Sequence, residues 1–260
     1  MRSFKLGLLL SLVCLFSFSV PAFAHEFIIK PDNFSPKSGE EIKVEVQAAH
    51  VFMESEEAEP LEDVAVYLLQ DKKETPISFK ESKDGHSLVG TFKLPEDGAA
   101  ILVGHRTRDI VSKTTEGFLD GGRKELEAQG KTVLSVNKYE KYAKTFLNTQ
   151  VKSEMFSRAL GQELEIVPVS DLSMLKVGDY LEAKLLYKGK ALRSPVWATY
   201  DGFTKESNTY AYYTESEKDT FKVKITHPGI WMIRSEHTAK QTGKDAENHV
   251  LRTVLVFEVR

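Results

Sequence analysis

The chain has 260 residues, of which 41% are hydrophobic and 28% charged, a composition typical of a globular protein with room for two domains of ordinary size. Setting aside residues 1–24, which hold two basic residues and no acidic ones, leaves 33 basic and 38 acidic residues and a net charge of −5. This mildly acidic balance argues against a nucleic-acid partner, which would require a basic face.

Residues 1–24 have the three parts of a secretory signal peptide. Two basic residues precede an apolar run from Leu6 to Val20, and Ala22-Phe23-Ala24 matches the small-residue A-x-A cleavage motif. The apolar run is too short to span a membrane. We therefore predict cleavage after Ala24 and a periplasmic or secreted protein that begins at His25 and does not itself span a membrane.

The single cysteine, Cys14, lies inside this predicted signal peptide. The mature protein would therefore contain no disulfide, no thiolate metal site and no cysteine nucleophile. Its stability must come from burial alone, even though export leads to an oxidising compartment.

The first half of the mature chain consists of short strand patterns separated by Gly, Pro and Asp turns. Residues 41–49 alternate apolar and polar side chains, which predicts a half-buried strand that ends at His50. The other strands predicted in this half cover residues 27–29, 64–69, 88–94, 99–104, 132–137 and 142–147. Residues 106–131 are polar and glycine-punctuated, and only one short helix is predicted there, at 123–129.

The second half repeats the same pattern. Its predicted strands cover residues 163–167, 180–187, 196–200, 220–226, 230–235 and 252–259. These elements predict an all-β protein with two immunoglobulin-like β-sandwich domains and a short helical or irregular insertion. We place the N-terminal domain, which would carry a metal site, at residues 25–155 and the C-terminal domain at residues 156–260.

Cleavage after Ala24 would give His25 two nitrogens able to hold one cation. Its free α-amine and imidazole Nδ1 would close a six-membered chelate ring, and neutral nitrogen donors suit nickel, copper, cobalt and zinc. The amine titrates near pH ~8, so a metal can displace its proton at neutral pH. The simpler interpretation is that the histidine follows the cleavage site by chance.

Such a chelate needs a further ligand from another element, and three histidines are candidates. His50 is the best placed, since the first two strands can pair antiparallel; otherwise it is a histidine at a solvent-exposed strand end. His105 ends a strand of the same domain, but its neighbours Arg106 and Arg108 would repel a cation. His237 follows a strand of the second domain, so a ligand there would place the metal between the domains.

The remaining histidines, His86, His227 and His249, are predicted to be solvated residues of turns and loops. The acidic run Glu54–Asp63 could attract cations or supply an oxygen ligand, with Glu54 nearest to His50. The simpler interpretation of this run is a solvated loop.

Several stretches together resemble a known family: His25-Glu26-Phe27, Ala49-His50-Val51-Phe52, Ser112–Gly117, Gly161–Pro168 and Pro228–Trp231. The chain resembles the periplasmic domain family associated with nickel uptake, which is grouped with the NikM-type component of energy-coupling-factor transporters. The resemblance implies an exported β-sandwich protein that binds a transition metal, nickel or cobalt, and assists its uptake by a membrane transporter. It also implies that His25 and His50 occupy the positions of the family's N-terminal and strand-end histidines.

Two other functions stay open. The same pair of histidines would suit a copper-binding histidine-brace protein, either a buffer or an oxidase-like protein, and a structural or adhesive β-sandwich module would need no metal. No nucleophile elbow, phosphate loop or paired-carboxylate motif is found, so we predict a protein that is not an enzyme. Copper binds most tightly to almost any nitrogen site, so the sequence does not identify the metal.

Overall fold

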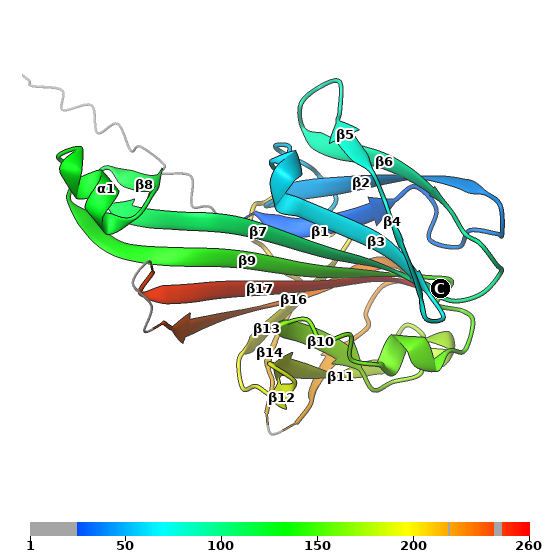
Figure 1. Cartoon of the computed structure of the whole chain (residues 1–260). Coiled ribbons are helices and arrows are strands. Elements are labelled where there is room, and N and C mark those ends of the chain that lie inside the picture. Colours follow the sequence, from blue (N-terminus) through cyan, green and yellow to red (C-terminus); the bar gives the residue numbers. More distant parts are fainter. Residues whose placement is uncertain (1–24, 218, 242–245) are drawn as a thin grey trace, which may run out of the picture.

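The computed structural model describes residues 25–217, 219–241 and 246–260, so the predicted signal peptide lies outside the described residues. The described chain forms three β-sheets with one short α-helix and three 3-10 turns, which confirms the prediction of an all-β sandwich (Figure 1). Within the described residues, no helix has both the length and the apolar character needed to cross a bilayer.

Two small sheets and one large sheet account for all the strands. The first small sheet has the order β1–β2–β6–β5: Glu26–Pro31, Glu41–Ala49, Ser87–Lys93 and Phe79–Glu81. The second has the order β10–β11–β12, with β15 also paired to β11: Leu164–Pro168, Tyr180–Tyr187, Lys190–Ala191 and Phe221–Lys224.

The large sheet contains nine strands from both halves of the chain. Its order is β14–β13–β16–β17–β9–β7–β3–β4, with β8 also paired to β7: Tyr212–Glu215, Pro195–Tyr200, Gly229–Lys240, Asn248–Val259, Val133–Leu147, Ala100–Thr114, Val64–Gln70, Lys73–Pro76 and Gly117–Asp120. The two halves meet where β17 pairs in parallel with β9. Whether residues 25–155 and 156–260 fold as separate domains stays a prediction.

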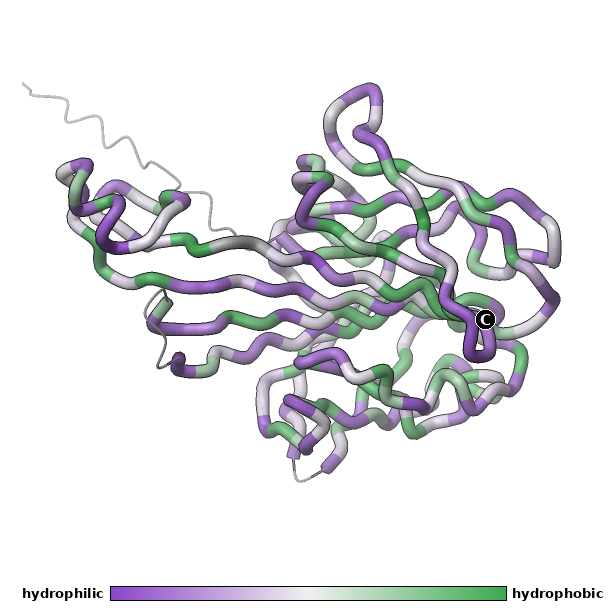
Figure 2. The backbone as a smooth tube through the Cα atoms, viewed as in Figure 1, coloured by the Kyte–Doolittle hydropathy of each residue, from purple (hydrophilic) through white to green (hydrophobic). Residues whose placement is uncertain are grey.

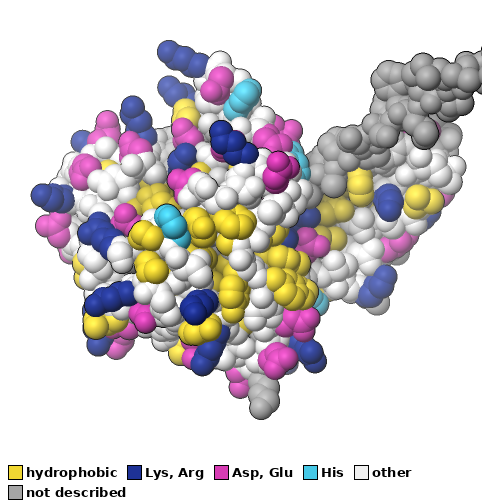
Figure 3. All heavy atoms as spheres, turned by 180° about the vertical axis from the view of Figure 1, so that it is seen from behind, with side chains coloured by type: hydrophobic (Ala, Val, Ile, Leu, Met, Phe, Trp, Pro, Cys, Tyr) yellow, Lys and Arg dark blue, Asp and Glu magenta, His cyan; other side chains and the backbone are white. Residues whose placement is uncertain are grey.

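The large sheet is the middle of three layers (Figure 1). Alternating residues of β7 show this arrangement: Ala100 and Leu102 pack against β1, β2 and β6, whereas Ile101 and Val103 pack against β10, β11 and β15. Two hydrophobic cores therefore lie on opposite faces of one sheet. Hydrophobic segments gather where the layers overlap, and the back of the molecule shows hydrophobic side chains among charged ones (Figures 2 and 3).

The strands β7 and β9 extend beyond the two small sheets. They carry β8 and the helix α1, Arg123–Ala128, at their far end, where Leu126, Val133 and Val136 form a small separate cluster (Figure 1). The other short turns are η1, η2 and η3, at Leu61–Asp63, Glu154–Ser157 and Leu172–Met174.

These long strands correct three sequence expectations. β7 does not end at His105 but continues through the segment expected to be irregular, and the single strand β9, Val133–Leu147, stands where two strands were expected. β17 begins at Asn248, so His249 belongs to a strand rather than to a loop. The polar stretches form strands because their backbone groups pair with neighbouring strands. Alternation of side chains in the sequence does not predict such pairing. The helix at 123–128 agrees with the prediction.

Candidate metal site

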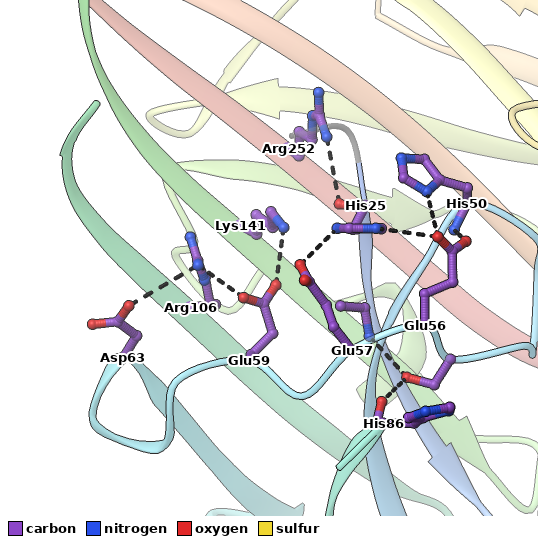
Figure 4. Close-up of polar contacts among 12 residues, drawn as sticks. His25, His50, Glu56, Glu57, Glu59, Asp63, His86, Arg106, Lys141 and Arg252 are labelled. Carbon is purple, nitrogen blue, oxygen red and sulfur yellow. Dashed lines mark hydrogen bonds and ion pairs between the residues drawn. The ribbon is translucent and has the colours of Figure 1, made fainter. Parts of the chain in front are cut away.

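The first two strands bring His25 and His50 together. β1 and β2 pair antiparallel, with Glu26 opposite Ala49, so the two histidines stand next to each other at one end of the ladder. Their ring centroids are 4.0 Å apart, and the ring planes are inclined by 51° (Figure 4). This is the pairing that the sequence predicted for these strands.

Close packing against the large sheet fixes the strand that follows His25. Phe27 and Ile29 are buried over β7 at Gly104, where an added Cβ would lie 2.6 Å from Ile29 Cδ1 and 2.9 Å from Phe27 Cε1. The hydroxyl of Thr145 on β9 donates a hydrogen bond of 2.6 Å to the carbonyl of Ile29. Gly104 and this buried hydrogen bond therefore determine how closely β1 packs on the large sheet.

The chain after His50 turns back and places Glu56 between the two histidines. Met53 adopts a left-handed conformation with φ of 69°, and Glu56 N donates a hydrogen bond to Ala48 O at 2.9 Å. Glu56 Oε1 accepts a hydrogen bond from the backbone N–H of His50 at 2.8 Å. Its other oxygen, Oε2, lies 2.9 Å from His50 Nδ1 and 3.4 Å from His25 Nε2. One carboxylate oxygen thus faces both rings.

The surroundings favour a neutral His25 and an ionised Glu56. Burial, together with the neighbouring His50, lowers the pKa of His25. Burial raises the pKa of Glu56, but the hydrogen bonds from the ring and backbone of His50 outweigh it and hold that pKa below its usual value. A neutral imidazole and an ionised carboxylate are the protonation states in which these groups bind metals.

A second carboxylate from the same loop faces the other nitrogen of His25. Glu57 Oε1 lies 3.0 Å from His25 Nδ1, the nitrogen that the predicted chelate would use. The side chain of Glu57 is 59% exposed, whereas that of His25 is 12% exposed, so Glu57 reaches the ring from the solvent side. In the uncleaved chain the His25 nitrogen is an amide, so the chelate through the α-amine stays a prediction.

Buried cations lie close behind this group. Glu59 is buried and binds both Arg106 Nη2 at 2.8 Å and Lys141 Nζ at 3.0 Å (Figure 4). These three side chains and His25 line a recess of about 20 Å³, enough for a single water-sized ligand. Residues of the acidic run therefore line the site, and the run is not only a solvated loop. Its residue beside His50 is Glu56 and not Glu54.

The two other predicted histidine candidates lie elsewhere. The ring of His105 stacks on Tyr142 with centroids 4.7 Å apart, on the face of the large sheet opposite to that of Arg106, so that arginine does not stand between His105 and a ligand on its own face. His237 lies on β16 against the ring of Tyr187, 4.6 Å away, and does not belong to the group formed by His25, His50 and Glu56.

The molecule is thus a three-layered β-sandwich protein with a histidine–glutamate cluster at the start of its first strand. The chain belongs to the DUF4198 family, a domain of unknown function, whose profile matches residues 22–239. This family description names no ligand and no activity. No curated protein matches the chain.

Several solved structures are similar to parts of the chain. They include the ectodomain of mouse nectin-like molecule 4, with Ig1–Ig3 (12% identity, 90% of this chain, 65% of that chain, TM-score 0.21), and the D0-D1 domain of intimin (11% identity, 89% and 98%, TM-score 0.21). A cytokine receptor complex is also similar (9% identity, 85% and 98%, TM-score 0.20). The chain thus spans less than two thirds of the nectin-like ectodomain.

Proposed function

We propose that this protein is an exported, non-enzymatic binder of a divalent transition metal, held by His25, His50 and Glu56. One observation carries the proposal: His25 Nε2 and His50 Nδ1 converge on the same oxygen of Glu56. The three ligand atoms lie within 4.8 Å of one another. Neutral imidazoles and a carboxylate form a donor set that suits nickel, cobalt, copper and zinc.

The spacing of the atoms supports this assignment. Ligand atoms at about 2.1 Å from a tetrahedral ion are separated from each other by about 3.4 Å. The separation of His25 Nε2 and Glu56 Oε2 is 3.4 Å, and that of His50 Nδ1 and Glu56 Oε2 is 2.9 Å. Small side-chain rotations therefore suffice to receive an ion, and a fourth position is left for water.

Nickel or cobalt is the ion we propose, with delivery to a membrane transporter as its use. This part rests on the resemblance of the chain to the nickel-uptake family and on the nitrogen-rich donor set. Copper is the alternative, since it binds more tightly than nickel to almost any site of this kind. Oxidation of ascorbate with peroxide production by the copper-loaded protein would favour the oxidase-like alternative.

The test is calorimetric titration of Ni²⁺, Co²⁺ and Cu²⁺ into the protein that begins at His25. We expect His50→Ala to weaken binding at least tenfold, about 1.4 kcal/mol. The matched control is His86→Ala, because His86 is an exposed loop histidine outside the group formed by His25, His50 and Glu56. Equal binding by His50→Ala and His86→Ala would contradict the proposal, and the structural or adhesive function would take its place if no metal bound.

A second preparation, with one alanine in front of His25, separates the two ways in which His25 can bind. The extra residue removes the amine from the chelate but leaves the ring in place. If the ion is held through Nε2 beside Glu56, both preparations bind equally. If it is held by the amine and Nδ1, the extended preparation binds at least tenfold more weakly.

A further inference from the structure

A second group of histidines and carboxylates lies on the opposite face of the large sheet. It consists of Glu140 on β9, His249 on β17 and Glu163, which immediately precedes β10. His105 on β7 lies beside Glu140. The strands explain the assembly: His105 pairs with Tyr142, and Leu251 pairs with Glu140, so that His249, two residues earlier, projects from the same face. The three strands lie side by side (Figure 1).

The geometry around Glu140 repeats that around Glu56. Glu140 Oε2 lies 3.5 Å from His105 Nε2 and 3.7 Å from His249 Nε2. Glu163 Oε1 lies 3.7 Å from His249 Nδ1. The separations from His105 Nε2 and His249 Nε2 are long for hydrogen bonds but close to the spacing of about 3.4 Å between ligands of one tetrahedral ion. Glu163 Oε1 faces Nδ1, the nitrogen of His249 that would not bind that ion.

The histidine nitrogens here lack other partners. His249 is 6% exposed, and its Nε2 is buried without a hydrogen-bond partner among the described residues. The same holds for His105 Nε2, although the imidazole as a whole is 40% exposed. Buried polar atoms in native proteins are usually paired, so two unpaired nitrogens aimed at one carboxylate oxygen require an explanation.

We propose that this group is a second site for a first-row divalent cation of the zinc type. Glu140, Glu163 and His249 each offer one ligand atom within 4.8 Å of the others. His105 completes the set from the more exposed side, with its Nε2 3.5 Å from Glu140 Oε2. The ion would join the segment before β10 to the three long strands, and it would satisfy both unpaired nitrogens.

Neighbouring side chains are arranged to support such a site. Tyr142 stacks under His105 and donates a hydrogen bond to Glu140 Oε2 at 2.6 Å, so it positions two of the ligands. Burial lowers the pKa of His249 in spite of the nearby carboxylates, which favours the neutral imidazole that a metal needs.

Two lysines contact the carboxylates. Lys138 Nζ lies 2.5 Å from Glu140 Oε1, the oxygen that does not face the histidines, and Lys188 Nζ lies 3.2 Å from Glu163 Oε1, the same oxygen that faces His249. Their side chains are 40% and 61% exposed, so both can turn to solvent when an ion enters. Each lysine competes with the metal for its carboxylate. Removing one should therefore strengthen metal binding, whereas a purely structural ion pair would give no such gain.

The experiment measures binding of Zn²⁺ by calorimetry, and of Co²⁺ by visible absorption, in the whole protein and in variants of each site. We expect two ions per chain in the parent, one in the His25→Ala/His50→Ala double variant and one in His249→Gln. His105→Ala, at a partly exposed position, should weaken the second ion at least tenfold, and Lys188→Ala should strengthen it. His86→Ala is the matched control for the loss of a histidine.

The outcomes separate this site from the N-terminal one. If the His25→Ala/His50→Ala variant binds no ion, the second site is refuted, whatever the state of the first. If that variant still binds one ion but His105→Ala and Lys188→Ala leave its affinity unchanged, the ion lies elsewhere and the proposal also fails. Retention of both ions by the double variant would instead refute the function proposed for His25 and His50. His105→Ala and Lys188→Ala keep the test valid even if His249→Gln does not fold.

Discussion

Replacing Glu59 by glutamine should destabilise the protein strongly. The Glu59 carboxylate is buried between Arg106 and Lys141, whose side chains are only 3% and 9% exposed. Glutamine would keep the shape but leave Lys141 buried without its counter-ion and Arg106 with only Asp63, 4.0 Å away. Removing one partner of a buried ion pair costs about 3–5 kcal/mol. At about 2–4 °C per kcal/mol for a chain of this size, the midpoint of thermal unfolding should fall by about 6–20 °C.

The measurement is urea and thermal unfolding followed by circular dichroism, with the slope against urea checked for two-state behaviour. Glu62→Gln is the matched control, because it makes the same chemical change at an exposed position of the same loop and should alter stability by less than about 0.5 kcal/mol. If Glu59→Gln unfolds at the same temperature as Glu62→Gln, the reasoning from buried charge is wrong.

The same carboxylate predicts how stability depends on pH. Burial raises the pKa of Glu59, but Lys141 and Arg106 outweigh it and place the pKa below the ordinary value of 4.5. Because the unfolded chain then binds a proton more readily than the folded one, this contribution is present above pH 4.5 and is lost as the pH falls through the lower folded value. Unfolding titrations at decreasing pH should show this loss in the parent and not in Glu59→Gln.

Two further substitutions test the packing of the layers. Glu165→Leu should lower the free energy of unfolding in urea by about 3–5 kcal/mol, because it leaves the fully buried Lys144 without its ion-pair partner, 2.8 Å from Nζ. Adding Lys144→Met should recover part of that loss. Gly104→Ala should cost about 1–3 kcal/mol by overpacking under β1, and calorimetry should show weaker metal binding because His25 precedes that strand. Gly122→Ala, with open space around the added carbon, is the control and should be neutral in both measurements.

The sequence predicts the part of the site that depends on local pairing. Alternation along residues 41–49 and the turn before it predict that β2 returns beside β1, which brings His50 to His25. The role of Glu56 is harder to predict from the sequence. It depends on the left-handed turn at Met53, a residue type that rarely adopts that conformation, so the acidic run does not reveal which carboxylate turns inward.

The second cluster could not be predicted in the same way. His249 and Glu140 are brought together by the parallel pairing of β17 with β9, and the register of that pairing is not encoded by either strand alone. The polar residues of β7 and of the start of β17 also break the apolar alternation on which strand prediction depends. As a result, the sequence predicts a solvated loop for His249, which is buried, and it predicts repulsion of a cation at His105 by Arg106, which projects from the other face of the strand.

The remaining carboxylate of the first site can decide how His25 binds its ion. Glu57 Oε1 lies 3.0 Å from His25 Nδ1, so it orients the ring if the ion is held at Nε2. Glu57→Ala should then weaken metal binding by about 10-fold, the lower end of what loss of an orienting partner costs. If the ion is held by the α-amine and Nδ1 instead, Glu57 competes for that nitrogen, and its removal should leave binding equal or tighter. Calorimetry on the protein that begins at His25 distinguishes the two, and unfolding curves of the variant exclude a loss of fold as the cause. A tenfold weakening in Glu57→Ala, together with equal binding by the alanine-extended protein, assigns the ion to Nε2, because only an orienting role for Glu57 predicts both results.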